Sequence, residues 1–323
     1  MIITRAPLRV ELLGGSTDIK NFYSKNIGRV LNFTINKYIY VTINKSFDNK
    51  YRFINIKGVD ETDSIDGIQN IYVRTVLKYF KIKTPLEIIS LSDIHLDGTG
   101  LGSSSSFVVA LISGIKKLMK LNLKKREIAE LACKIEIDLM KCPIGKQDQY
   151  ASVYGGLTYY KFDKNGYVTV KKINNLDYDI KKLRKHIMIF YTGYSRSSSG
   201  LLKNQNENID ANRTHLADMS DLVISGMHAI QKNNFIKLAD VLYSEWSIKK
   251  NLMGGVVNKD IDEMYNLAVS SGAWGGRVSG AGGGGFMILI VKPNLHNHIR
   301  TVLANYKELD FEILDKGAEI LLY

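Results

Sequence analysis

The residues with the clearest potential for chemistry lie at 98–107, where the sequence reads GTGLGSSSSF. Glycine permits backbone conformations that other residues avoid and lets amide groups approach a ligand closely. Apolar residues recur at helical spacing directly afterwards, at 108–119, and the first turn of a helix presents unpaired N–H groups and a positive dipole end. This segment therefore predicts a phosphate-binding loop. Its members would be Gly98, Gly100, Gly102, Ser103, Ser104, Ser105 and Ser106.

The common nucleotide-binding motifs do not account for this loop. A Walker A motif needs Ser or Thr after Gly-Lys, whereas Gly145-Lys146 continues into Gln147. The glycine run at 280–285 fits the loose pattern G-x-G-x-x-G, but an apolar run with strand character follows it, where a dinucleotide site needs a helix. The His-Arg-Asp and Asp-Phe-Gly tripeptides of protein kinases do not occur. Phosphate binding must use another framework.

Composition describes an ordinary globular protein, with 323 residues of which 45% are hydrophobic and 24% charged. The N-terminus does not resemble a secretory signal, and the apolar stretches are too short to cross a bilayer, so we expect a cytoplasmic protein. Cys133 and Cys142 are too few for a disulfide framework, and the histidines form no zinc motif. The net charge of +12 favours anionic ligands. No nucleic-acid motif accompanies it, so small molecules are the expected partners, with neither nucleic acid nor membrane among them.

Apolar periodicity alternates between strand-like and helix-like segments in the first half of the chain, and the second half is mainly helical. Strands are expected at 8–13, 38–44, 51–56, 86–91, 157–162, 167–172, 187–191, 286–291 and 311–314. Helices are expected at 68–80, 103–119, 125–140, 213–231, 235–246 and 261–270. We therefore predict an α+β protein with two domains, at 1–175 and 176–323.

Three separated segments together resemble the motifs of the GHMP small-molecule kinases. Residues 6–18 (APLRVELLGGSTD) resemble the first motif, 98–107 the second and 276–285 (GRVSGAGGGG) the third. Their order and spacing agree over nearly the whole chain. The resemblance implies an N-terminal ATP-binding domain with a ribosomal-protein-like two-layer α/β fold, a ferredoxin-like C-terminal α+β domain, and an active site between them.

Within this family, segments such as GLGSSSSF and GKQDQY are most similar to the branch that acts on D-glycero-D-manno-heptose 7-phosphate. The resemblance implies an ATP- and Mg²⁺-dependent kinase that phosphorylates the anomeric hydroxyl for a nucleotide-activated heptose of surface polysaccharide. A kinase for fucose, mannose or galactose would share most of these motifs. A sensor that kept the fold but lost catalysis would be expected to lose Asp148, Glu136 or a glycine loop, and all of them are present.

Phosphoryl transfer depends on positioning and charge neutralisation, and the resemblance supplies a residue for each task. Asp148 matches the catalytic aspartate, which would accept or orient the proton of the sugar hydroxyl. Arg9 matches the cation that would favour the carboxylate form of Asp148 and stabilise the transferred charge. Lys146 is a second candidate for these tasks, ranked below Arg9. Ser104 and Glu136 match the hydroxyl and carboxylate positions that hold Mg²⁺, a hard ion that prefers oxygen ligands.

Sugar recognition is expected at Gly15, Ser16, Thr17 and Asp18. Galactokinases place Glu-His where this chain has Gly15-Ser16, so the missing side chains are predicted to make room for a longer sugar phosphate and to remove a repelling carboxylate. Asp18 would accept hydrogen bonds from sugar hydroxyls.

Two further loops are expected to reach the ligands. A substrate phosphate needs donors, and Arg196, Ser197 and Lys203 form a candidate anion site near a strand-to-helix junction. Ordinary helix capping is the alternative for these residues. Gly280, Gly282 and Gly283 would let a backbone loop of the C-terminal domain approach the phosphates or the sugar.

Overall fold

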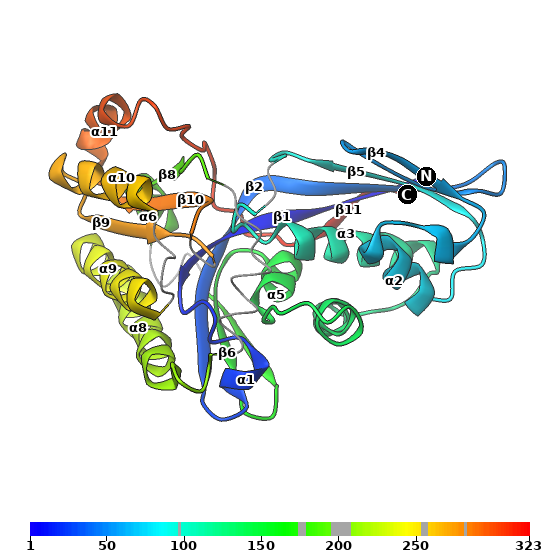
Figure 1. Cartoon of the computed structure of the whole chain (residues 1–323), viewed down its shortest axis with the longest axis horizontal. Helices are drawn as coiled ribbons and strands as arrows, with labels where there is room; N and C mark the ends of the chain where they lie inside the picture. The colour runs from blue at the N-terminus through cyan, green and yellow to red at the C-terminus, as the bar shows by residue number, and fades with distance from the viewer. Residues whose placement is uncertain (96–97, 174–178, 195–207, 253–257, 281–282) are drawn as a thin grey trace.

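The structure is a computed structural model that describes residues 1–95, 98–173, 179–194, 208–252, 258–280 and 283–323. Figure 1 shows a long sheet built mainly from the N-terminal half and a smaller sheet with its own helices from the second half. Among the described helices, none is both long and apolar enough to span a bilayer.

Strand β2 (Gly28–Lys45) is the central strand of the large sheet. One edge pairs antiparallel with β1 (Ile2–Leu13), while the other pairs with β5 (Leu86–Ser92) and then with β6 (Leu157–Phe162). An extended strand of 18 residues is about 60 Å long, so two shorter strands fit end to end along one of its edges. The remaining strands are β3 (Tyr51–Asn55), β4 (Gly58–Thr62), β7 (Val168–Lys172) and β11 (Glu319–Leu322), and the order along the main path is β11-β1-β2-β5-β3-β4.

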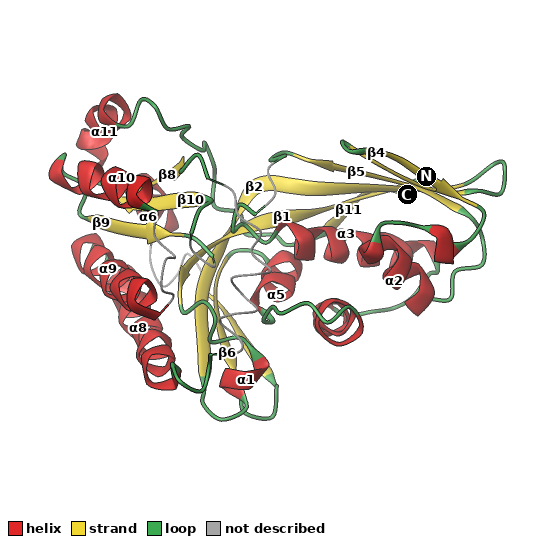
Figure 2. Cartoon of the chain, in the orientation of Figure 1, coloured by secondary structure: helices red, strands yellow, loops and turns green. Residues whose placement is uncertain are grey.

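The helices α2 (Ile71–Tyr79), α3 (Ser103–Leu118) and α5 (Gln147–Tyr154) lie on the same face of the large sheet (Figure 2). The middle one, α3, is buried without interruption from Ser105 to Ile115 and packs on β1 and β2. This packing fixes the N-terminal end of α3 relative to the end of β1. The same half also contains α1 (Lys20–Tyr23), a 3₁₀ turn at Ile65–Gly67, α4 (Lys125–Cys133) and a π-helix at Lys134–Leu139.

The second half forms an antiparallel sheet in the order β8-β10-β9, from β8 (Ile187–Tyr191), β9 (Gly275–Val278) and β10 (Phe286–Ile290). Helix α9 (Phe235–Leu252) packs on β9, and α8 (Arg213–Gln231) packs both on α9 and on β1 and β2 of the large sheet. Thus α8 and α9 join the two halves. The other elements are α6 (Ile180–His186), α10 (Lys259–Ser270), a 3₁₀ turn at Pro293–Leu295 and α11 (His296–Val302).

The α+β prediction is confirmed, and most expected elements are present, with two corrections. The helix expected at 125–140 changes to π-helical geometry at Lys134. The final strand is not at 311–314, where the described pairing is an isolated bridge between Ile313 and Ile35. It lies instead at Glu319–Leu322 and pairs with β1, so the end of the chain returns to the N-terminal sheet.

Candidate active site

The predicted phosphate loop has the backbone geometry of an anion site. Gly98, Gly100 and Gly102 all have left-handed φ angles, of 67°, 72° and 74°. Helix α3 begins at Ser103, directly after Gly102, and no side chain caps its first turn. The amides of Ser103, Ser104 and Ser105 therefore lie at a helix N-terminus that is suited to a phosphate group. Ser106 has another role, because its hydroxyl donates to the carbonyl oxygen of Pro7 inside the fold.

The glycine loop of the second half lies directly against the phosphate loop. A Cβ at Gly100 would come within 2.7 Å of the Ser279 carbonyl oxygen, and a Cβ at Gly280 within 2.9 Å of Gly100 Cα. A Cβ at Gly285 would lie 2.3 Å from the Thr99 carbonyl oxygen. Glycine is therefore needed on both sides, because only backbones without side chains approach this closely. Gly283 has a left-handed φ of 74°, and Gly282 lies outside the described residues.

Arg9 and Asp148, the predicted catalytic residues, form an ion pair beside the predicted phosphate loop. Arg9 comes from β1, and its Nε lies 2.8 Å from Oδ1 of Asp148, which is in the first turn of α5. A second guanidinium nitrogen, Nη1, donates to the carbonyl oxygen of Gly100. The Arg9 side chain is 5% exposed and that of Asp148 is 20% exposed, so the carboxylate keeps contact with solvent. One guanidinium thus joins the predicted base to the loop.

Lys146, the second candidate for this role, has other contacts. Its ammonium lies 3.1 Å from Glu130 Oε2 and 3.1 Å from the Gly166 carbonyl oxygen. Glu130 also accepts a hydrogen bond from the Tyr150 hydroxyl. These contacts hold α4, α5 and the β6–β7 turn together, and they favour a structural role for Lys146 over a catalytic one.

Glu136 is fully buried on the π-helix, and burial raises its pKa to about 7. Gln149 Nε2 donates to its Oε2 at 2.6 Å, and its Oε1 has no hydrogen-bond partner among the described residues. The side chain next to Glu136 is that of Ser105, while Ser104 is exposed and lies near Tyr72. The described residues contain no group of three His, Cys, Asp or Glu side chains that could hold a metal. A free carboxylate oxygen with nearby hydroxyls is the sparse oxygen set that Mg²⁺ uses when phosphates and water complete its shell.

Asp18, the last residue of the first motif, contacts the start of α5 and lies near enough to Asp148 to be affected by its charge. Its Oδ2 accepts from the backbone N–H of Gln147 at 2.9 Å, and the side chain is 2% exposed. Burial raises the pKa of Asp18 to about 7, and the negative charges of Asp148 and Glu11 act in the same direction. The Thr17 hydroxyl is used within the loop, since it lies 2.7 Å from the Gly14 carbonyl oxygen and 2.8 Å from that of Arg29 and donates its one hydrogen between them.

The space beside Gly15 is filled by the protein itself. A Cβ at Gly15 would lie 2.1 Å from Glu11 Oε1, so the missing side chain makes room for Glu11 and not for a longer sugar. This corrects the prediction that the missing side chain at Gly15 makes room for a longer sugar phosphate. Ser16 next to it has a left-handed φ of 74°. The predicted phosphate donors Arg196, Ser197 and Lys203 lie outside the described residues.

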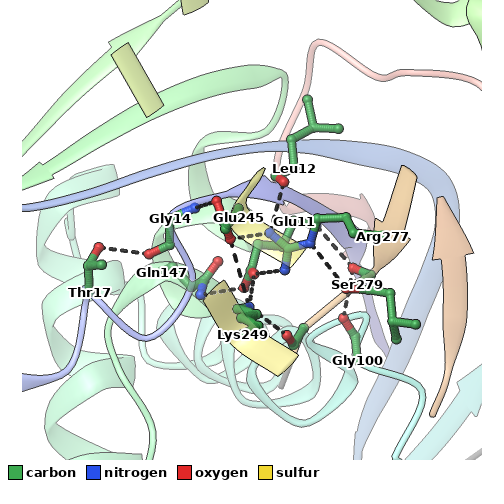
Figure 3. A network of polar contacts seen from close by, with 12 residues as sticks. Glu11, Leu12, Gly14, Thr17, Gly100, Gln147, Glu245, Lys249, Arg277 and Ser279 are labelled. Carbon is green, nitrogen blue, oxygen red and sulfur yellow. Dashed lines mark hydrogen bonds and ion pairs between the residues drawn. The ribbon is translucent and has the colours of Figure 1, made fainter. Parts of the chain in front are cut away.

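Glu11 belongs to a buried charge cluster that sequence reasoning missed. Its Oε1 lies 2.7 Å from Arg277 Nη2 and 3.0 Å from Lys249 Nζ (Figure 3). Arg277 also pairs with Glu245, whose Oε2 accepts from the Gly14 backbone N–H at 2.8 Å. All four charged side chains are at most 2% exposed. The available signal was the presence of Glu11 and Arg277 inside otherwise apolar or glycine-rich motif segments.

The comparisons with known proteins match this architecture. The model of the GHMP kinases N terminal domain matches residues 70–156, and that of the GHMP kinases C terminal domain matches 227–307. The chain is 32% identical to the D-glycero-alpha-D-manno-heptose 7-phosphate kinase of Campylobacter jejuni, over 90% of each chain. It is 24% identical to the galactokinase of Thermotoga maritima, over 93% of this chain and 92% of that one. A crystal structure of a D-glycero-D-manno-heptose 1-phosphate kinase from Bacteroides thetaiotaomicron has a TM-score of 0.81 at 24% identity, over 100% and 99% of the two chains.

The contact between the glycine loops predicts that Gly100→Ala weakens ATP binding and stability together. Alanine in a left-handed conformation costs about 1–2 kcal/mol, and its Cβ would also press on the Ser279 carbonyl at 2.7 Å. Gly166→Ala is the matched control, because φ is 83° but the nearest heavy atom is 3.9 Å away. Melting temperature and the KM for ATP should change more in Gly100→Ala. Equal effects of the two substitutions would contradict the loop contact.

The raised pKa of Asp18 predicts a stability that depends on pH. A carboxyl group with a pKa near 3.8 when unfolded and about 7 when folded makes the native state progressively less stable between these pH values, and the loss is complete above pH 7. Asp18→Asn removes this loss. We expect its melting temperature to exceed that of the wild type by a few degrees at pH 8, with a much smaller gain at pH 5. Asp218 is exposed, so Asp218→Asn is the control for the change from Asp to Asn. If Asp18→Asn raised the melting temperature equally at pH 5 and pH 8, the raised pKa of Asp18 would be refuted.

Proposed function

This chain belongs to the GHMP kinase family, and we propose that it transfers the γ-phosphoryl group of ATP to the anomeric hydroxyl of D-glycero-D-manno-heptose 7-phosphate, giving the 1,7-bisphosphate. The family makes it an ATP-dependent phosphotransferase. The substrate proposal draws on the heptose kinase relative at 32% identity. We place this reaction in the cytoplasm. The product would be used to synthesise a nucleotide-activated heptose, which is a precursor of surface polysaccharide.

The observation that carries the proposal is the joint position of Arg9, Asp148 and the loop carbonyl of Gly100. In the transfer, the anomeric oxygen bonds to the γ-phosphorus as the bond to the β-γ bridging oxygen breaks, and ADP leaves. Asp148 accepts the hydroxyl proton, and its partly exposed carboxylate is available for this. Arg9 holds that carboxylate at 2.8 Å and places positive charge next to the phosphate loop.

Other residues are suited to bind the ATP phosphates, Mg²⁺ and the sugar. The N-terminal end of α3 would bind the ATP phosphates through backbone amides and the helix dipole. Glu136 and a hydroxyl of Ser104 or Ser105 would hold Mg²⁺, which when bound neutralises phosphate charge. Asp18 would accept hydrogen bonds from sugar hydroxyls. Gly280 and Gly283 would bring the second-half backbone close to the ligands.

We also propose the division into a domain at 1–175 and a domain at 176–323. The sheet order supports it, with the exception of β11, which pairs with β1 of the first domain. The active site would then lie between the domains, where Arg277 and Lys249 of the second contact Glu11 of the first.

The substrate is tested by measuring ADP release with MgATP and each of four sugars: D-glycero-D-manno-heptose 7-phosphate, mannose, fucose and galactose. We expect the heptose phosphate to be preferred, and phosphorus NMR should locate a new phosphate on the anomeric oxygen. Turnover on an unphosphorylated sugar alone would overturn the substrate but keep the kinase. No turnover on any of them would favour a ligand sensor.

The role of Asp148 is tested by separating binding from chemistry in Asp148→Asn. Asparagine keeps the shape but is a poor proton acceptor, so turnover should fall by about 10²–10⁴-fold. The affinity for MgATP, measured by calorimetry, should stay within a few fold of the wild type. Near-normal turnover would remove Asp148 from its proposed role.

A further inference from the structure

Gln147, next to the proposed base, makes three hydrogen bonds, two through its side-chain amide and one through its backbone N–H. It is the first residue of α5 and is 7% exposed. Its Nε2 lies 2.9 Å from Glu11 Oε2 and 3.4 Å from Asp18 Oδ1, and its backbone N–H donates to Asp18 Oδ2 at 2.9 Å. The amide is therefore held between the carboxyl groups of Glu11 and Asp18. Figure 3 shows the contact with Glu11.

These neighbours determine which way the amide points. Glu11 is held as a carboxylate by Lys249 at 3.0 Å and Arg277 at 2.7 Å, and a carboxylate can only accept hydrogen bonds. The NH₂ group of Gln147 must consequently face Glu11, and the carbonyl oxygen must face the other way. The cations of the second half thereby set the orientation of a side chain beside Asp148.

Within the described part of the chain, the carbonyl oxygen of Gln147 has no partner. Its Oε1 is buried and accepts no hydrogen bond from the described residues. A buried amide oxygen without a donor costs about 1–3 kcal/mol, and most such groups in native proteins are paired. The same turn of helix carries Asp148, and the backbone N–H of Gln147 contacts Asp18, the predicted sugar-binding carboxyl. A donor is missing where the sugar is expected to bind.

We propose that Gln147 is a substrate-binding residue whose Oε1 accepts a hydrogen bond from a ring hydroxyl of the sugar. The inference rests on the proposed sugar kinase activity and names a contact that the activity alone does not require. The ligand group is a hydroxyl, because only a donor satisfies an amide oxygen and a phosphate or carboxylate would be repelled. Glu11, Lys249 and Arg277 act through Gln147 and are positioning residues.

The test compares the parent sugar phosphate with its 2-, 3- and 4-deoxy derivatives, using wild type and Gln147→Met. A site built to bind a hydroxyl discriminates strongly against the analogue that lacks it. We expect wild type to prefer the parent over one derivative by about 10-fold or more in kcat/KM. Gln147→Met should lose that preference for the same derivative, keep the preferences at the other positions, and leave the KM for ATP nearly unchanged.

Gln149→Met is the matched control, because Gln149 lies on the same helix but donates to Glu136. It should lower turnover without changing the order of preference among the deoxy sugars. A uniform loss over all sugars in Gln147→Met would show that Gln147 only supports the structure, and unchanged preferences would also overturn the proposal.

The proposed function is checked separately by the wild-type enzyme with heptose 7-phosphate. If the enzyme phosphorylates mannose, fucose or galactose instead, the substrate proposal fails and the deoxy forms of that sugar test Gln147 in the same way. If it phosphorylates none of them, both proposals are overturned.

Discussion

Four charged side chains buried at one place hold the two halves of the molecule together. Glu11 and Glu245 carry negative charge, Lys249 and Arg277 carry positive charge, and all are nearly inaccessible to water. Such a cluster is costly to desolvate and is stable only when every member is paired, so losing one member leaves a buried charge that costs about 3–5 kcal/mol. Since Glu11 belongs to β1 and its partners to α9 and β9, the pairing fixes how the first and third glycine motifs face each other.

The second constraint is the close approach of backbone to backbone between the two glycine loops. Gly100 and Gly280 are in contact through main-chain atoms, and Lys249 donates to the Gly280 carbonyl at 3.0 Å. The charge cluster therefore also anchors the loop that packs on the proposed phosphate site. Arg9 completes the connection, because it bonds both the Gly100 carbonyl and Asp148. The position of the proposed base relative to the predicted phosphate loop thus depends on contacts from both halves.

Many helices and strands could be predicted from the sequence, because apolar periodicity and turn residues determine them locally. The helix after the phosphate loop and the strand at Ile187–Tyr191 follow from apolar periodicity and turn residues. The Arg9–Asp148 pair could be predicted because both residues lie in motifs of recognisable order. Pairing between distant segments leaves no periodic signal, so the return of β11 to β1 and the neighbours of Glu11 were missed. The change to π-helical geometry at Lys134 was also missed, because the apolar spacing there still fitted an α-helix. The interpretation of Gly15 failed for a different reason, because a missing side chain does not reveal which neighbour fills its space, here Glu11.

Two buried carboxyl groups, those of Asp18 and Glu136, have no cationic partner among the described residues, and this indicates which ligands the site suits. Among the described residues, Glu11 has two cationic partners and Asp148 has one, whereas the hydrogen bonds that Asp18 and Glu136 accept come from amide groups. Burial raises the pKa values of Asp18 and Glu136 to about 7. A buried carboxyl group in this state is stabilised by any ligand that brings donors or positive charge. Sugar hydroxyls suit Asp18, and a divalent cation suits Glu136. Asp18 accepts a hydrogen bond from Gln147 and Glu136 accepts one from Gln149, and Asp148 lies between these two glutamines on α5. Ligands that bind both carboxyl groups would therefore place their reacting atoms near the proposed base. Binding energy gained at the unpaired carboxyl groups would then be used to align the hydroxyl with the phosphate, which is the main requirement of phosphoryl transfer.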